Sequence, residues 1–168
     1  RVRGDHEALA PERLDRGHAG ALSGHLPAIA IAGALVCAWF TAYFVWLAAP
    51  RDDATLIAAG LVSLFIGAGV WTAIWALWTR VMRGEARWVT HAAIALGAAA
   101  VLMAVQWVIA VGWFAFDLPK IPARDALLTM TLAAVALYWH ISAGAPISRR
   151  TALLFAIVVP LLLVGTTS

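Results

Sequence analysis

The longest apolar run of the chain carries its strongest structural signal. Residues 88–116 read WVTHAAIALGAAAVLMAVQWVIAVGWFAF, a continuous apolar run that contains no charged residue. A transmembrane helix needs about 20 predominantly apolar residues to cross about 30 Å of hydrocarbon, and this run is longer than that. We therefore predict a membrane-spanning helix here, and the excess length indicates a tilt or an interfacial first turn.

The composition of the whole chain agrees with a membrane location. Of its 168 residues, 63% are hydrophobic and only 12% are charged, and the mean hydropathy is +0.86. Soluble domains carry about 25% charged residues, so the charge that would cover a soluble surface is missing. This excludes a soluble globular fold, and the length suits one compact bundle rather than two domains.

Further apolar runs flank this stretch on both sides, separated by short polar or proline-containing segments. The predicted spans are 26–49, 54–79, 88–116, 126–143 and 151–165. Each run is continuously apolar, whereas the strands of membrane barrels alternate between polar and apolar residues. The expected fold class is therefore all-α: a polytopic membrane helical bundle of about five transmembrane helices.

The ends of the last two spans carry local signals. Asp125 and Ser148 are predicted helix N-caps, because their side-chain oxygens can accept hydrogen bonds from first-turn amides. The last span is short and contains Pro160. We expect it either to be truncated or to cross the bilayer only partly.

The few charges predict the orientation. Cytoplasmic loops carry an excess of Lys and Arg. If the N-terminus is inside, nine basic residues face the cytoplasm (Arg1, Arg3, Arg13, Arg16, Arg80, Arg83, Arg87, Arg149 and Arg150) and three face outward (Arg51, Lys120 and Arg124). We therefore predict an N-inside topology in a bacterial inner membrane.

The first 25 residues form a linker-like cytoplasmic tail in this prediction, because they combine balanced charges with little apolar content. A linker joins something, and the chain opens on Arg1 rather than Met, so we expect a fragment or processed product with a soluble domain upstream. The scattered basic residues form no patch for nucleic acid, and no nucleic-acid partner is expected.

No span contains Asp, Glu, Lys or Arg. Proton-coupled transporters, carboxylate-lined channels and voltage sensors need charge at depth, so these classes are disfavoured. The sequence also lacks phosphate loops, nucleophile elbows and zinc motifs. We predict no catalytic residue, no enzyme activity and no cofactor.

Four residues inside the spans are candidate ligand contacts. Gln106 needs an external partner, which is either another helix or a ligand in a cavity. Trp71, Trp75 and Trp78 recur at i, i+4 and i+7 on the second span. They form either a packing or lipid-facing ridge, or a groove for a lipid or quinone.

Two histidines fall near the inner face, His91 at the start of the third span and His140 near the end of the fourth. Antiparallel passage puts them at similar depth, as a bis-imidazole haem b or a metal site would require. The alternative is that both are interfacial histidines with water or headgroup partners.

Arg80, Arg83 and Arg87 are concentrated between the second and third spans. Such a cluster fixes topology and attracts anionic lipid headgroups. It is also a candidate docking surface for a cytoplasmic protein partner or an attached domain.

Several short stretches resemble the C-terminal membrane region of bacterial inner-membrane proteins that carry an N-terminal forkhead-associated domain. The similarity covers roughly residues 27–165. It rests on WALWTR (75–80), GEARWVTH (84–91), FAF (114–116) and YWH (138–140), followed by Pro146 and Arg149-Arg150. It implies that a phosphothreonine-binding module lies upstream. The present chain lacks that module, so no phosphopeptide-binding residue is carried over.

The sequence thus predicts an integral inner-membrane anchor or scaffold for a cytoplasmic signalling or interaction module, without catalysis of its own. The alternative is a haem- or quinone-binding electron-transfer bundle that uses His91 and His140.

Overall fold

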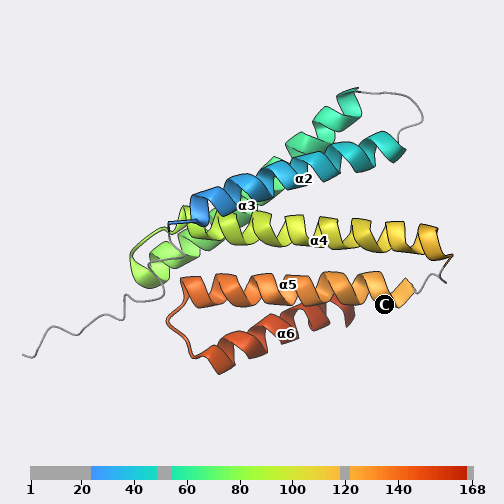
Figure 1. Ribbon diagram of the computed structural model, residues 1–168. Coiled ribbons are helices and arrows are strands. Elements are labelled where there is room, and N and C mark those ends of the chain that lie inside the picture. The colour runs from blue at the N-terminus through green and yellow to red at the C-terminus, as the bar shows by residue number, and fades with distance from the viewer. Residues whose placement is uncertain (1–23, 49–53, 118–121, 166–168) are drawn as a thin grey trace, which may run out of the picture.

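A computed structural model describes residues 24–48, 54–117 and 122–165, and it shows an all-α bundle (Figure 1). The helices are α2 (Leu26–Ala48), α3 (Ala54–Arg83), α4 (Trp88–Phe116), α5 (Pro122–Gly144) and α6 (Arg149–Gly165). The predicted fold class is confirmed. Most of the predicted tail, residues 1–23, lies outside the described residues.

Among the described residues, four helices are long and apolar enough to cross a membrane, namely α2, α3, α4 and the 126–144 part of α5. The chain is therefore a multi-pass membrane protein by the length and composition of its helices. Helix α6 is shorter, with 17 residues, and contains Pro160. A fifth crossing stays a prediction.

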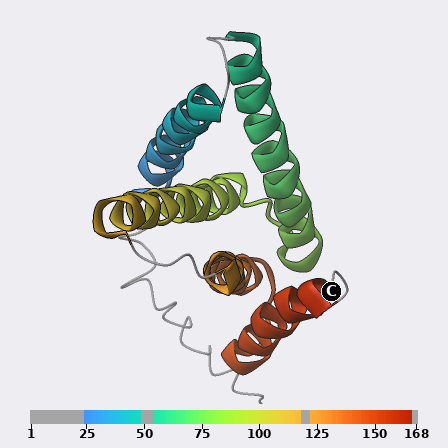
Figure 2. The same ribbon diagram turned by 90° about the vertical axis from the view of Figure 1, so that its right-hand side faces the viewer.

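Helix α4 lies at the centre of the bundle. In Figure 1, α2 and α3 lie on one side of it and α5 and α6 on the other. Figure 2 shows that α3 runs obliquely past α4, from the level of α2 to that of α5. Its first half passes Thr41 and Val45 of α2 at Gly60, and its last turns reach Gly144 of α5. Helix α3 is thus the element that joins the two sides.

Two of the interhelix links lie at one end of the bundle. The α3–α4 and α5–α6 links are both near the start of α2 (Figure 1). A hydrogen bond from Arg83 Nη2 to the Ala145 carbonyl oxygen, 3.0 Å long, connects them. The basic residues of these links therefore share an end, and its position on the cytoplasmic side remains a prediction.

The helix ends differ in part from the predicted spans. Helix α3 continues beyond Thr79, so Arg80 and Arg83 lie in its last turn, where positive charge is favourable. The predicted cap at Asp125 is wrong, because α5 already begins at Pro122, a residue suited to the first helical position. The predicted cap at Ser148 is confirmed, since its Oγ accepts a 3.2 Å hydrogen bond from the Thr151 amide.

Candidate functional site: a buried histidine pair

His91 and His140 are both completely buried, with no exposed surface. His91 lies in the first turns of α4 and His140 in the last turns of α5, and the antiparallel packing of these helices brings them to the same depth. Their Nδ1 atoms are 2.9 Å apart. The ring planes differ by only 19° at a centroid separation of 5.2 Å, as expected for rings that meet edge to edge. The sequence predicted the shared depth, and the structure adds direct contact.

Two tryptophans of α3 cover the pair. Trp71 Nε1 donates a 3.0 Å hydrogen bond to Nε2 of His140. The Trp75 indole stacks on the His140 ring, with centroids 5.0 Å apart and planes 11° apart, and it also lies 6.2 Å from the His91 ring. The tryptophan stripe therefore contributes two of its three predicted members to this site.

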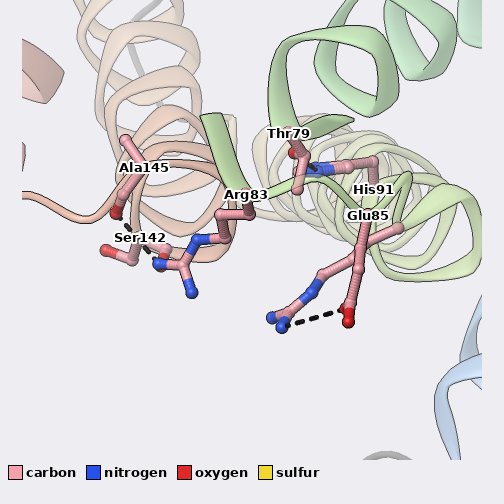
Figure 3. A network of polar contacts seen from close by, with 7 residues as sticks. Thr79, Arg83, Glu85, His91, Ser142 and Ala145 are labelled. Atoms are coloured by element: carbon pink, nitrogen blue, oxygen red, sulfur yellow. Dashed lines mark hydrogen bonds and ion pairs between the residues drawn. The ribbon is translucent and has the colours of Figure 1, made fainter. Parts of the chain in front are cut away.

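Thr79 completes the site. Its Oγ1 is 2.6 Å from His91 Nε2, as Figure 3 shows. The same atom is 2.7 Å from the Trp75 carbonyl oxygen, and the residue is fully buried. Trp71, Trp75 and Thr79 recur every four residues, so they share one face of α3. Sequence reasoning missed Thr79 because a threonine in a helix can bond to its own backbone. The signal that could have revealed it is its position one turn beyond Trp75.

The hydrogen bonds fix the protonation of both rings. An indole N–H can only donate, so His140 Nε2 carries no proton and its Nδ1 must donate to His91 Nδ1. His91 Nδ1 is then an acceptor, and the ring's single proton is on Nε2, facing Thr79. Thr79 Oγ1 accepts a hydrogen bond from the His91 Nε2–H, and the Thr79 hydroxyl donates a hydrogen bond to the Trp75 carbonyl oxygen. The hydrogen bond from Trp71 and the hydrogen bond to the Trp75 carbonyl thus require the same arrangement, with two neutral imidazoles in opposite tautomers.

Gly144 allows α5 to reach this chain of hydrogen bonds. A Cβ at Gly144 would lie 3.0 Å from Thr79 Oγ1 and 3.9 Å from His91 Cε1. Any larger side chain would press on the threonine hydroxyl. The absence of a side chain here is therefore part of the site.

The pair does not fit haem b as axial ligands. Two axial imidazoles must point nitrogens at an iron from opposite faces of a porphyrin, yet here the Nδ1 atoms are in hydrogen-bond contact. Both Nε2 atoms are also engaged, by Trp71 and Thr79. Among the described residues, no group of three or more His, Cys, Asp or Glu could hold a metal ion. These histidines bind each other.

The other predicted site residues lie elsewhere. Gln106 is on α4, about 22 Å along the helix from His91 at 1.5 Å per residue. Trp78 borders an apolar groove between α3, α5 and α6. Arg83 donates to the carbonyls that end α5, as Figure 3 shows, while Arg87 pairs with Glu85 at 3.8 Å and Arg80 is exposed.

Searches of protein-family models, curated proteins and solved structures found no match to this chain.

Proposed function

We propose that this chain is a membrane-embedded anchor or scaffold for a cytoplasmic signalling or interaction module in a bacterial inner membrane, and that it performs no catalysis itself. The observation that carries the proposal is the closed chain of hydrogen bonds at the histidine pair. It starts at an indole, which is not an acid, and ends at a backbone carbonyl. Such a chain of hydrogen bonds can hold helices together, but neither of its end groups can release or take up a proton.

The position of the pair supports a structural role. Polar side chains at depth in a membrane contribute to helix association when they bond across helices. Here one chain of bonds links α3, α4 and α5, and Arg83 adds a bond from α3 to the end of α5. These contacts fix the positions of α3, α4 and α5 relative to one another at the basic end of the bundle, as an anchor requires.

The charges at that end support the direction of anchoring. Arg80 and Arg87 are exposed near the α3–α4 link, and the predicted N-inside topology puts them on the same side as the tail. An upstream or separate cytoplasmic module would therefore meet this surface. The resemblance to membrane regions of proteins with forkhead-associated domains agrees with such an arrangement.

Proximity labelling tests the proposal. A biotin ligase fused to the N-terminus should label a reproducible set of cytoplasmic proteins. Labelling should fall several-fold in the double variant Arg80→Gln, Arg87→Gln and remain unchanged in the matched variant Arg51→Gln, Arg124→Gln, which alters the predicted outer loops. Labelling that is insensitive to the first variant, or confined to the other side of the membrane, would contradict an anchoring surface here.

Reconstitution in liposomes tests the absence of transport or redox activity. The purified protein should show no Soret band, extract no quinone and move no ions above empty liposomes. A Soret band that disappears with His91→Ala would instead restore the electron-transfer alternative.

A further inference from the structure

An apolar groove of about 800 Å³ runs between α3, α5 and α6. Its walls include Trp75 and Trp78 of α3, Ile141 of α5, and Phe155 of α6. Trp78 and Phe155 are 49% and 55% exposed, so the described part of the chain leaves the groove uncovered. The volume is within the range of about 300–1,000 Å³ that is usual for small-molecule sites. In a bilayer, such a groove faces hydrocarbon chains.

Basic residues surround one end of the groove. Val81 and Met82 line this end, and Arg83 follows them directly. Arg83 Nη2 donates to the carbonyl oxygen of Ala145, which also lines the groove, so the guanidinium is held at its edge. Because a guanidinium carries five N–H donors, further donors remain for a ligand.

The start of α6 adds charge at the same end. Ile147 lines the groove, and the exposed residues Arg149 and Arg150 follow it after the cap at Ser148. The only acidic side chain in the neighbouring 84–87 link, Glu85, forms an ion pair with Arg87. The apolar groove therefore ends at a cluster of positive charge.

We infer that this groove is a binding site for an anionic phospholipid, with one acyl chain between α3, α5 and α6 and the phosphate among Arg83, Arg149 and Arg150. A nonpolar wall alone would accept any lipid, and the arginines supply the preference for negative charge. Each basic residue near a membrane surface favours anionic lipid by about five-fold in affinity. This inference is independent of the anchoring role, since it depends only on the groove and its charges.

Tryptophan quenching by brominated lipids tests the site. The protein is placed in phosphatidylcholine vesicles that contain increasing fractions of phosphatidylglycerol or phosphatidylcholine with dibrominated acyl chains. Brominated phosphatidylglycerol should reach half of its maximal quenching at a mole fraction at least five-fold lower than brominated phosphatidylcholine does. Equal curves for the two lipids would overturn the proposal.

Two pairs of variants locate the binding. Arg149→Gln with Arg150→Gln should reduce the preference several-fold, to what Arg83 alone supplies, whereas Arg80→Gln should keep it in full; Arg83 is left intact because it also bonds the end of α5. Trp78→Phe should lower the high-affinity part of the quenching and leave the share that Trp75 reports, whereas Trp39→Phe on α2, which is 70% exposed, should leave that part unchanged. Circular dichroism confirms that each variant is folded.

Other occupants give different results. A preference that is unchanged in the double arginine variant would show that the headgroup is not bound at this end, and the proposal would fail. Quenching by a brominated isoprenoid quinone that an equal concentration of unbrominated phosphatidylglycerol does not relieve would show a site for neutral lipids, and the proposal would fail. Quenching that is lost as the protein becomes more concentrated, together with cross-linked dimers, would show that a second copy covers the groove.

Discussion

The α2–α4 interface and the junction of α3, α4 and α5 hold the same central helix by opposite means. At the first, Gly33 allows the helix backbones to come so close that a Cβ there would lie 2.9 Å from the Leu96 carbonyl carbon and oxygen. Cys37, also buried, lies one turn further along and donates a 3.6 Å hydrogen bond to the Leu96 oxygen. At the second, the contacts are made by His91, His140 and Thr79.

The difference shows two solutions to one physical problem. Lipid is as apolar as leucine, so the hydrophobic effect does not draw helices together within a bilayer. Close van der Waals packing needs small residues, whereas hydrogen bonding needs polar residues that are fully paired. The first interface should therefore fail when a side chain becomes larger, and the second when a partner is removed.

The largest effect is expected from Gly33→Ala. The new methyl group would meet backbone atoms of α4, which cannot rotate away, so the free energy of unfolding should fall by about 1–3 kcal/mol. Unfolding in a detergent titration followed by circular dichroism measures this. Gly69→Ala on α3, where a Cβ meets nothing within 4 Å, is the matched control and should be neutral or slightly stabilising. Equal losses at both positions would refute close packing at Gly33.

Removal of one histidine should come next. His140→Ala breaks the bonds to Trp71 and His91 and should cost about 1–2 kcal/mol of unfolding free energy, while the exposed His25 should tolerate alanine. The same titration measures both. Because His91 and His140 share one bond, the double variant should cost less than the sum of the single variants. Strict additivity would mean that the pair is not coupled.

A smaller loss is expected from Arg83→Gln. The arginine donates to the carbonyl oxygens of Ser142 in the last turn of α5 and of Ala145 directly after it, where a positive charge is worth about 0.3–1 kcal/mol. The melting temperature should fall slightly, and the difference from the native protein should shrink in high salt. Arg80→Gln removes a charge from the same last turn of α3 and should have a weaker effect. If the two variants behave alike, the bond to α5 contributes nothing measurable.

The last prediction concerns the tautomers of the two histidines and is tested on the unaltered protein, so no change in stability is expected. Nitrogen-15 magnetic resonance of histidine-labelled protein should show two neutral rings in opposite tautomers, with the proton on Nδ1 in His140 and on Nε2 in His91. The hydrogen bonds of Trp71 and Thr79 determine this pattern. All five histidines carry the label, so the signals of His91 and His140 must first be assigned. Identical tautomers in these two rings, or a charge on either of them, would contradict the direction of the chain of hydrogen bonds.

Sequence reasoning found part of the site for identifiable reasons. His91 and His140 were predicted at a shared depth because antiparallel spans of known length leave little choice. Trp71 and Trp75 were found through their periodicity, but Trp78 was included and Thr79 was not, since hydropathy does not reveal which way a helix is rotated. Gly33 was likewise missed, although its neighbours Leu96 and Gly97 lie in the longest apolar run.

The apolar runs of the sequence are enough to predict a membrane protein, and the positions of its charges along the chain are enough to predict its loops. They are enough because a bilayer requires every spanning backbone to pair its own hydrogen bonds over about 20 apolar residues. Which side chains contact each other between the helices becomes visible in the folded bundle alone. All faces of these helices are largely apolar, so their rotation and crossing are set by a few close contacts, at Gly33 and at the histidine pair, that no pattern along the chain reveals.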